Sequence, residues 1–331
     1  MRKYATRFLT RSDIARLMSL DDYLLAAEEA FAGMATGRIG APPPMHLAGS
    51  GGGFHVKGAS SAGDSRHVAV KLNGNFPDNP LKRNLPTIQG VIVLADATDG
   101  SMLVIMDSME VTLQRTAAAT ALAARHLARA DASTLAICGC GAQAVVQLRA
   151  LANVFPLRRV KLWDRDFERA RRFAKDFGGD PAIEIHAASD LDQVARDSDL
   201  IVTCTTATSP FLGPDCVSEG TFIAAVGADS PAKSEIMPAL MANSVIVTDV
   251  LEQCVVMGDL HHAVLAGRRA RDERYAELGE VVVGKRKPRA NDSDIVVFDS
   301  TGTAAQDLTA ALRIHQRASA ANIGVEISLG E

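Results

Sequence analysis

The stretch Thr134-Leu135-Ala136-Ile137-Cys138-Gly139-Cys140-Gly141-Ala142-Gln143-Ala144 decides the fold of this chain. An apolar run ends in a Gly-rich turn, and a helical pattern follows directly, which is how a dinucleotide-binding βαβ unit begins. Gly139 permits the tight turn, Gly141 lets the backbone approach a pyrophosphate, and Ala144 takes the small position where helix and strand pack. The first turn of the next helix offers free N–H groups and the positive dipole end to phosphates.

The residues that follow alternate between strand-like and helical patterns. Strand-like runs lie at 134–138, 159–163, 183–187, 200–204, 221–226 and 245–249. Helical patterns lie between them at 142–153, 166–177, 191–196 and 235–242. Such alternation with short connections predicts an α/β fold with a doubly wound parallel sheet, that is, a Rossmann domain. We expect this domain to span residues 116–303.

The N-terminal part predicts a different architecture. Residues 10–36 have helical apolar spacing. Strand patterns follow at 54–59, 68–73, 89–95 and 101–106, with the hairpin signal Asp99-Gly100 before the last of them. This pattern predicts an antiparallel or mixed sheet with a leading helix, and hence an α+β domain.

One long helix is expected to join the two domains. Asp107 and Glu110 have capping-box spacing, and the Ala-rich residues 111–130 contain neither Gly nor Pro. Near the C-terminus, a strand at 295–299 precedes a helix at 304–318, which follows the complete Rossmann domain. This last helix is therefore expected to return to the first domain, which would comprise residues 1–115 and 304–331.

Composition sets limits on the partners of this protein. With 331 residues, of which 47% are hydrophobic and 22% are charged, the chain resembles an ordinary two-domain globular protein. The net charge of −4 gives no reason to expect nucleic acid, and the basic residues 285–289 beside Pro288 are typical of a solvated loop. There is no apolar run of about 18 residues, so we expect no membrane span.

Five cysteines, an odd number with irregular spacing, indicate reduced thiols in a cytoplasm. Residues 1–10 contain no apolar core like that of a signal peptide. Cys138 and Cys140 flank Gly139, without a second ligand pair at metal spacing. We therefore expect no metal site.

Asp164 ends the second strand of the predicted Rossmann domain, 25 residues after Gly139. An acid near this position accepts the ribose hydroxyls and repels a 2′-phosphate, which favours NAD(H). Arg165 is adjacent and suits a 2′-phosphate, so NADP(H) stays possible. The alternative for Asp164 is a plain helix N-cap. We expect the cofactor to contact Gly139, Gly141, Ala142, Gln143, Asp164, Arg165, Thr203, Thr205, Val226, Ser300 and Gly302.

Ligands of open α/β sheets lie outside the carboxyl ends of the strands. Asp229 follows the strand at 221–226, where the nicotinamide is expected, and this location favours a functional role. The alternative is an N-cap for a helix near residues 233–235. Glu235 is expected to cap or position that helix.

Two cations are candidates for binding a substrate carboxylate. Arg115 lies early on the long helix among small residues, and its guanidinium matches a carboxylate. Lys71 interrupts an apolar strand. It lies either on the solvent side or in a cleft with its pKa lowered, where it suits acid–base work. Lys57, on the preceding strand, is a weaker candidate.

Together these residues resemble the ornithine cyclodeaminase/mu-crystallin family over roughly residues 55–315. The motifs that carry the resemblance are Val70-Lys71-Leu72-Asn73, Gln114-Arg115-Thr116-Ala117-Ala118, Gly139-Cys140-Gly141-Ala142-Gln143-Ala144, Gly227-Ala228-Asp229-Ser230-Pro231-Ala232-Lys233-Ser234-Glu235 and Phe298-Asp299-Ser300-Thr301-Gly302. The resemblance implies that Lys71 and Arg115 hold the substrate carboxylate and that Asp229 is the acid/base. It also implies a homodimer joined through the first domain, which is the substrate-binding and dimerisation domain.

The sequence departs from the family pattern in three places. The family usually has a basic residue near Pro44-Met45, and this chain has none there. Lys57-Gly58-Ala59 stands where the family often has Met-Pro-Ala, so Lys57 is a candidate replacement for the missing cation. Ornithine cyclodeaminases also carry a glutamate near the position of His55, and its absence disfavours ornithine as the substrate.

The resemblance implies an NAD(P)-dependent oxidoreductase acting on the C–N bond of an amino or imino acid. We expect a ketimine reductase for a cyclic imine such as 1-pyrroline-2-carboxylate. One alternative is an ornithine cyclodeaminase, in which the hydride returns and no net redox occurs. The other is a mu-crystallin-like protein that binds NAD(P)H and a small carboxylate without turnover.

Overall fold

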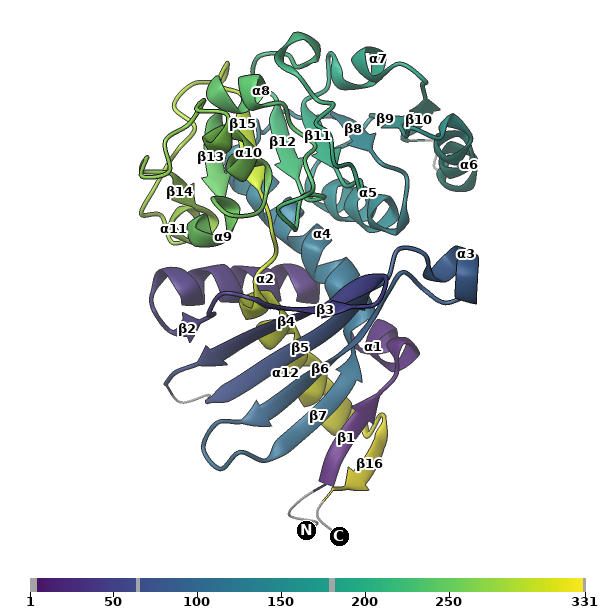
Figure 1. Ribbon diagram of the computed structural model, residues 1–331, viewed down its shortest axis with the longest axis vertical. Coiled ribbons are helices and arrows are strands. Elements are labelled where there is room, and N and C mark those ends of the chain that lie inside the picture. The colour runs from purple at the N-terminus through teal and green to yellow at the C-terminus, as the bar shows by residue number, and fades with distance from the viewer. Residues whose placement is uncertain (1–4, 64–65, 179–181, 330–331) are drawn as a thin grey trace. The chain divides into compact units, whose positions relative to one another are not determined.

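The computed structural model describes residues 5–63, 66–178 and 182–329 (Figure 1). The expectation for residues 1–10 therefore falls partly on residues 1–4, outside the described residues. The chain divides into two compact units. We call residues 1–115 and 303–331 the terminal unit and residues 116–302 the central unit. Thr303, expected in the Rossmann domain, groups with the terminal unit. Within the described residues, no helix is long and apolar enough to cross a membrane.

The central unit is the predicted doubly wound sheet. Its strands are β8 (Thr134–Cys138), β9 (Arg159–Trp163), β10 (Glu184–Ala187), β11 (Leu200–Thr203), β12 (Phe222–Ala225), β13 (Val245–Thr248), β14 (Ala276–Glu277) and β15 (Val296–Asp299). All pairs are parallel, in the order β10-β9-β8-β11-β12-β15-β13-β14. From β8 the chain runs outward through β9 to β10 and then crosses to β11 on the other side of β8, so the switch point lies between β8 and β11.

Helices connect these strands, and both faces of the sheet are buried. The helices are α5 (Ala142–Val154), α6 (Phe167–Phe177), α7 (Leu191–Ala195), α8 (Pro238–Ala242), α9 (Leu251–Cys254), α10 (Asp259–Leu265) and α11 (Leu278–Val282), with a 3₁₀ turn at Pro214–Cys216. Alternate residues such as Ala136, Ile201 and Ile223 join one core cluster with side chains of α7, α8 and α10. The residues between them, such as Leu135 and Val202, are buried as well. Burial on both faces explains why the central strands β8, β11 and β12 are continuous apolar runs.

The terminal unit is a mixed sheet. Its strands are β1 (Ala5–Leu9), β2 (Ile39–Gly40), β3 (Met45–Gly49), β4 (Gly52–Ser61), β5 (His67–Asn75), β6 (Ile88–Asp96), β7 (Met102–Asp107) and β16 (Val325–Ser328). The order is β16-β1-β7-β6-β5-β4-β2, with β3 paired to β4. Among the paired strands of the terminal unit that the structure describes, only β1 and β7 run parallel.

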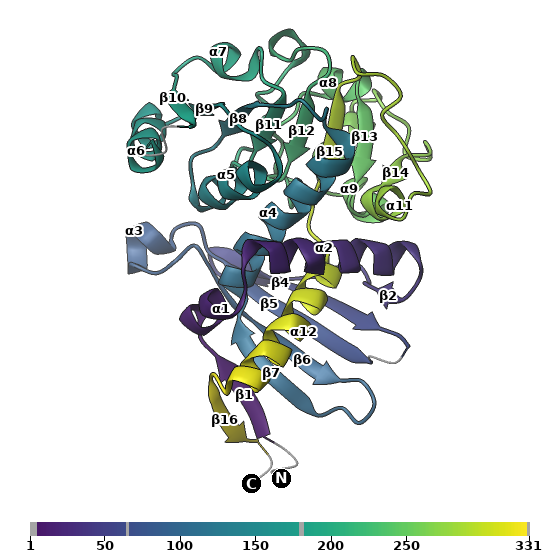
Figure 2. The ribbon, with the colours of Figure 1, turned by 180° about the vertical axis from the view of Figure 1, so that it is seen from behind.

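The helices of the terminal unit are α1 (Arg11–Leu17), α2 (Leu20–Ala35), α3 (Asn79–Arg83) and α12 (Ala304–Ala321), together with the first part of α4 (Ser108–Leu127). Figure 2 shows α12 lying across the sheet, and it packs on β4, β5 and β6 as well as on α2. The helix after the Rossmann domain therefore does return to the first domain.

Two local predictions needed correction. The helical stretch expected at 10–36 is two helices, because Ser19 and Asp22 form a second capping box and start α2 afresh. The helix expected at 235–242 begins only at Pro238, since residues 227–237 are a loop whose backbone N–H groups donate to buried carboxylates.

Candidate active site

The Gly-rich turn after β8 has the geometry of a phosphate-binding loop. Gly139 has φ of +102°, and a Cβ there would lie 2.8 Å from Cγ2 of Thr205 and 3.0 Å from the carbonyl oxygen of Cys204. A side chain at Gly139 is therefore excluded by strain and by space. A Cβ at Gly141 would meet nothing within 4 Å, and α5 starts at the next residue. The open approach and the helix N-terminus fit a pyrophosphate.

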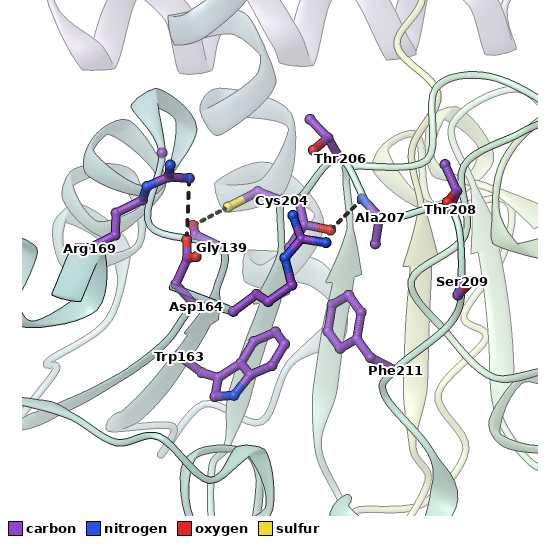
Figure 3. Close-up of a pocket in the computed structure, with 13 residues that line it drawn as sticks. Gly139, Trp163, Asp164, Arg169, Cys204, Thr206, Ala207, Thr208, Ser209 and Phe211 are labelled. Carbon is purple, nitrogen blue, oxygen red and sulfur yellow. Dashed lines mark hydrogen bonds and ion pairs between the residues drawn. The ribbon is translucent and has the colours of Figure 1, made fainter. Parts of the chain in front are cut away.

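Asp164 lies beside this loop, at the end of β9. Its Oδ2 accepts a hydrogen bond from the Cys140 N–H at 2.8 Å, and its Oδ1 accepts one from the Asp166 N–H at 2.9 Å. Arg169 on α6 approaches the same carboxylate at 3.9 Å (Figure 3). α6 is capped by Asp166, so the alternative role of Asp164 as its N-cap does not apply. The carboxylate is thus oriented by the loop, with lone pairs left for a ligand.

A pocket of about 450 Å³ opens beside Asp164 and the Gly-rich turn. Trp163 and Phe211 form part of its wall, with ring centroids 5.1 Å apart (Figure 3). The lining residues are Gly139, Gly141, Trp163, Asp164, Arg165, Arg169, Cys204, Thr205, Thr206, Ala207, Thr208, Ser209 and Phe211. Aromatic rings, hydroxyl groups and two arginines around a carboxylate suit the adenosine part of a dinucleotide.

The pocket brings together five of the residues predicted to contact the cofactor: Gly139, Gly141, Asp164, Arg165 and Thr205. The others lie elsewhere around the same strand ends. Ala142 and Gln143 begin α5, and Val226 follows β12. Thr203 is fully buried and donates to Oε2 of Glu235, while Ser300 and Gly302 donate to Oδ2 of Asp249.

Asp229 is half-exposed in the loop after β12. Its Oδ1 accepts a hydrogen bond from Nζ of Lys233 at 2.6 Å. No helix starts at 230–237, so the alternative role of Asp229 as a helix N-cap does not apply. The carboxylate is 51% exposed, which keeps it accessible to water and to a ligand.

Glu235 does not cap a helix. It is fully buried and accepts hydrogen bonds from the Thr203 hydroxyl, the Thr205 N–H and the Gly227 N–H. Burial, together with the charge of Asp259, raises the pKa of Glu235 to about 7. Glu235 therefore ties the loop after β11 to the loop after β12.

Three further buried carboxylates fix the neighbouring loops. Asp259 accepts from the backbone N–H groups of Glu235 and Ile236, and Asp299 accepts from those of Asp259 and Leu260. Asp249 binds the turn that holds Ser300 and Gly302. Burial, and next the charge of Asp259, raises the pKa of Asp299. These acids are anchors for backbone N–H groups at the carboxyl ends of the strands.

Lys71 is buried in the terminal unit, with 4% of its surface exposed. Its Nζ lies 2.9 Å and 2.7 Å from Oδ1 and Oδ2 of Asp307 on α12. Burial lowers the pKa of Lys71 from 10.5 to about 7; Asp307 opposes this shift, while Arg115 and Lys57 add to it. Of the two placements considered for Lys71, the structure thus has the buried one.

Arg115 points to the same carboxylate. Its Nε lies 3.6 Å from Oδ1 of Asp307, and its Nη1 donates to Oε1 of Gln306 at 3.2 Å. Lys57 stands directly opposite Lys71 in the β4–β5 register, so the two side chains leave the same face of the sheet. Lys71, Arg115 and Asp307, with Lys57 beside them, form what we call the cation cluster. It holds more positive than negative charge.

Sequence reasoning missed Asp307, Gln306, Arg169, the Trp163–Phe211 pair and the bridging role of Glu235. Asp307 had one available signal, because an acid stands among apolar residues in the first turn of α12. Within the described part of the chain, no group of three or more His, Cys, Asp or Glu side chains is placed to hold a metal ion.

Comparison with known proteins agrees with this geometry. Residues 4–322 match the model of the ornithine cyclodeaminase/mu-crystallin family. An archaeal alanine dehydrogenase, solved as a dimer with bound NAD, is 34% identical with a TM-score of 0.93, and the match covers 98% of this chain and 99% of that one.

Two solved reductases are also similar. The Δ1-pyrroline-2-carboxylate reductase of Thermococcus litoralis, in complex with NADH and L-proline, is 28% identical, with a TM-score of 0.92 and coverage of 97% and 100%. The iminosuccinate reductase of Paracoccus denitrificans, in complex with NAD⁺, is 31% identical, with a TM-score of 0.89 and coverage of 98% and 100%. The family match covers nearly the whole chain and agrees with the Gly-rich loop, the strand-end acid Asp164 and the cation cluster. This protein therefore belongs to the ornithine cyclodeaminase/mu-crystallin family.

Proposed function

We propose that this protein is an NAD(P)-dependent oxidoreductase that acts on the C–N bond of an amino or imino acid. Its reaction is the reduction of a ketimine, such as the cyclic imine 1-pyrroline-2-carboxylate. The observation that carries this proposal is the cation cluster, in which Lys71 and Arg115 are buried against the single carboxylate of Asp307. Buried charge without a counter-charge is costly, and a substrate carboxylate would supply the missing negative charge.

The cofactor would be held by the central unit, and NAD(H) is favoured. Gly139 and Gly141 leave the space that a pyrophosphate needs, and Asp164 offers an oriented carboxylate to the ribose hydroxyls. Arg165 and Arg169 line the same pocket and would accept a 2′-phosphate, so NADP(H) is a possible second cofactor. NADH, when bound, supplies a hydride to the imine carbon.

The chain's own residues would bind the substrate and handle its proton. Lys71 and Arg115 hold the carboxylate by charge-assisted hydrogen bonds, with Lys57 as a third cation. Asp229, directly or through water, exchanges a proton with the substrate nitrogen. Fixed cations and a fixed substrate orientation increase the reaction rate, because they need no rearrangement during the reaction.

Two alternatives from the sequence make different predictions. An ornithine cyclodeaminase would release ammonia and leave the amount of NADH unchanged over complete turnovers. A mu-crystallin-like binding protein would bind NAD(P)H and a small carboxylate and turn over neither. Lys71 and Asp307 are compatible with all three functions, so a kinetic measurement has to separate them.

The test is a panel of cyclic and open-chain 2-imino acids and 2-amino acids, each with NADH and NADPH, followed by nicotinamide absorbance. The proposal expects stoichiometric NADH consumption with at least one 2-imino acid. Ammonia release from ornithine at constant NADH would favour the cyclodeaminase. Tight NADH binding without any turnover would favour the binding protein. We also propose that the protein works in a reducing compartment such as the cytoplasm, because all five cysteines are free thiols.

We further propose that two copies associate through the terminal unit. The face of its sheet opposite Lys71 carries apolar side chains on neighbouring strands. They are Met45, Leu47, Phe54, Val70, Leu72 and Val91, each between 37% and 52% exposed. Met45, Val56, Leu72 and Val91 lie side by side across four strands, because each is paired with the next in the strand register. A contiguous apolar face of this kind is typical of an interface, and a second copy is the partner that the dimeric archaeal relative suggests.

A further inference from the structure

The first turn of α12 places two adjacent polar residues against the cation cluster. Gln306 and Asp307 are each 1% exposed. Their positions are fixed by α12, which begins with the Thr303 side chain accepting from the Ala305 N–H and packs along β4, β5 and β6. Polar groups buried this deeply remain in a fold only when their hydrogen bonds are satisfied.

Gln306 makes two hydrogen bonds with Arg115, in opposite directions. It accepts one from Nη1 of Arg115 at 3.2 Å and donates one from its Nε2 to the Arg115 carbonyl oxygen at 3.1 Å. The side-chain amide therefore bridges the guanidinium and the backbone of the same residue. This bridge limits the rotamers of Arg115 and sets the direction in which its guanidinium points.

Asp307 acts on Lys71 by charge. The ammonium is removed from water, and the charged and titratable groups around it are Asp307 from α12, Arg115 from α4 and Lys57 from β4. Arg115 and Lys57 disfavour the ammonium, whereas Asp307 alone among these three favours it. A neutral Lys71 could not form an ion pair with a carboxylate ligand, so the charge of Asp307 decides whether Lys71 contributes its charge to anion binding.

We propose that Gln306 and Asp307 are positioning residues for the substrate carboxylate: Asp307 keeps Lys71 charged, and Gln306 aims Arg115. Neither residue needs to touch the substrate. This inference rests on the proposed function for its kinetic readout, but its physical content concerns the ionisation of Lys71 and is measurable on its own.

The decisive variants are Asp307→Asn, which keeps shape and removes charge, and Asp307→Glu, which keeps the charge. In the wild type we expect kcat/KM for a 2-imino acid to fall as pH rises through the pKa of Lys71, which lies at about 7. Asp307→Asn should move this fall to lower pH by about one unit or more and raise KM about tenfold, with a smaller effect on kcat. Asp307→Glu should keep the pH dependence of kcat/KM that the wild type has.

Gln306→Leu is the matched control within the same turn of helix. It removes both hydrogen bonds to Arg115 and leaves the charges unchanged. We expect KM to rise about fivefold to tenfold, because this is the scale of losing hydrogen bonds to a charged group. The pH profile should stay unchanged. A shifted pH profile in Gln306→Leu, or an unshifted one in Asp307→Asn, contradicts the division of roles proposed here.

A second measurement does not depend on turnover. NMR of protein carrying isotope-labelled lysine follows the ionisation of Lys71, assigned by its loss in Lys71→Met. The proposal expects a lower pKa of Lys71 in Asp307→Asn and a wild-type pKa in Asp307→Glu, and an unchanged pKa in Asp307→Asn would overturn it. If the wild type reduces no imine while the pKa still moves, the proposed function fails and the role of Asp307 stands. If Asp307→Asn does not fold, the same titration is made in Asp307→Ser.

Discussion

Lys71 is buried, unlike an ordinary surface lysine, and burial lowers its pKa from 10.5 to about 7. Between these two values the folded protein binds fewer protons at Lys71 than the unfolded chain does. The free energy of unfolding therefore gains a contribution that increases as pH rises from 7 to 10.5.

Lys71→Met should remove this contribution. We expect the free energy of unfolding of the wild type, minus that of Lys71→Met, to increase between neutral and alkaline pH in urea titrations. Lys175→Met is the control, because it removes an exposed lysine on α6, in the central unit. The burial account of Lys71 is wrong if the difference is flat or decreases with pH.

Asp229 is the second residue whose role is open to a direct test. Asp229→Asn keeps the size of the side chain but removes the proton-exchanging group. We expect NADH binding to be retained and turnover of the imino acid to fall at least about 100-fold, the scale of a lost general acid or base. Lys233→Met, which removes the ion-pair partner of Asp229, should cost much less. Near-normal turnover in Asp229→Asn would remove Asp229 from the mechanism.

Among the elements, the loops after β11 and β12 depend on Glu235. Glu235→Leu would leave the buried N–H groups of Thr205 and Gly227 and the hydroxyl of Thr203 without an acceptor. We expect the free energy of unfolding to fall by about 3 kcal/mol, at about 1–3 kcal/mol for each unsatisfied group with partial relaxation. Urea denaturation measures this loss, and Glu219→Leu, which removes an exposed glutamate, should change stability little. An equal effect of both substitutions would show that Glu235 is not an anchor.

The inner strands of the sheet in the central unit, such as β8 and β11, were predictable because they are buried on both faces. The pattern at 134–138 coincides with β8, since a buried parallel strand is a continuous apolar run. The pattern at 159–163 coincides with β9, in which buried Val160 and Leu162 alternate with less buried residues. β1 and β16 were not predicted. Their pairing partners are distant in sequence, Ala5 with Ser328 for example, and β16 is exposed at the edge of the sheet, so no local periodicity marks it.

The candidate site was predictable only where one residue carries the signal by itself. Gly139, Lys71 and Arg115 stand out against their neighbours, and the structure places the two cations on one carboxylate. Asp307 lies 236 residues from Lys71 along the chain, so no spacing rule connects the two. The sequence predicts that Glu235 caps or positions a helix, whereas it joins two loops, because its three partners come from loops that only the sheet brings together.

For the whole molecule, the apolar face of the terminal unit predicts self-association. Leu72→Glu would put a charge in the middle of this face, where burial against a second copy would be costly. We expect the wild type to sediment as a dimer and Leu72→Glu as a monomer. Leu25→Glu is the matched control, because Leu25 is half-exposed on α2 and lies off the sheet. If Leu72→Glu remains a dimer, the interface is not this face of the sheet.

The central claim is that this chain transfers a hydride to the imine carbon of a 2-imino acid. It is tested most directly with NADH that carries deuterium at the transferable position of the nicotinamide, supplied with 1-pyrroline-2-carboxylate and followed by mass spectrometry and NMR of the product. The account predicts one deuterium per product molecule, located at the α-carbon, with one NADH consumed for each. NADH consumption without deuterium at the α-carbon, or no labelled amino acid from any 2-imino acid tested, would contradict it.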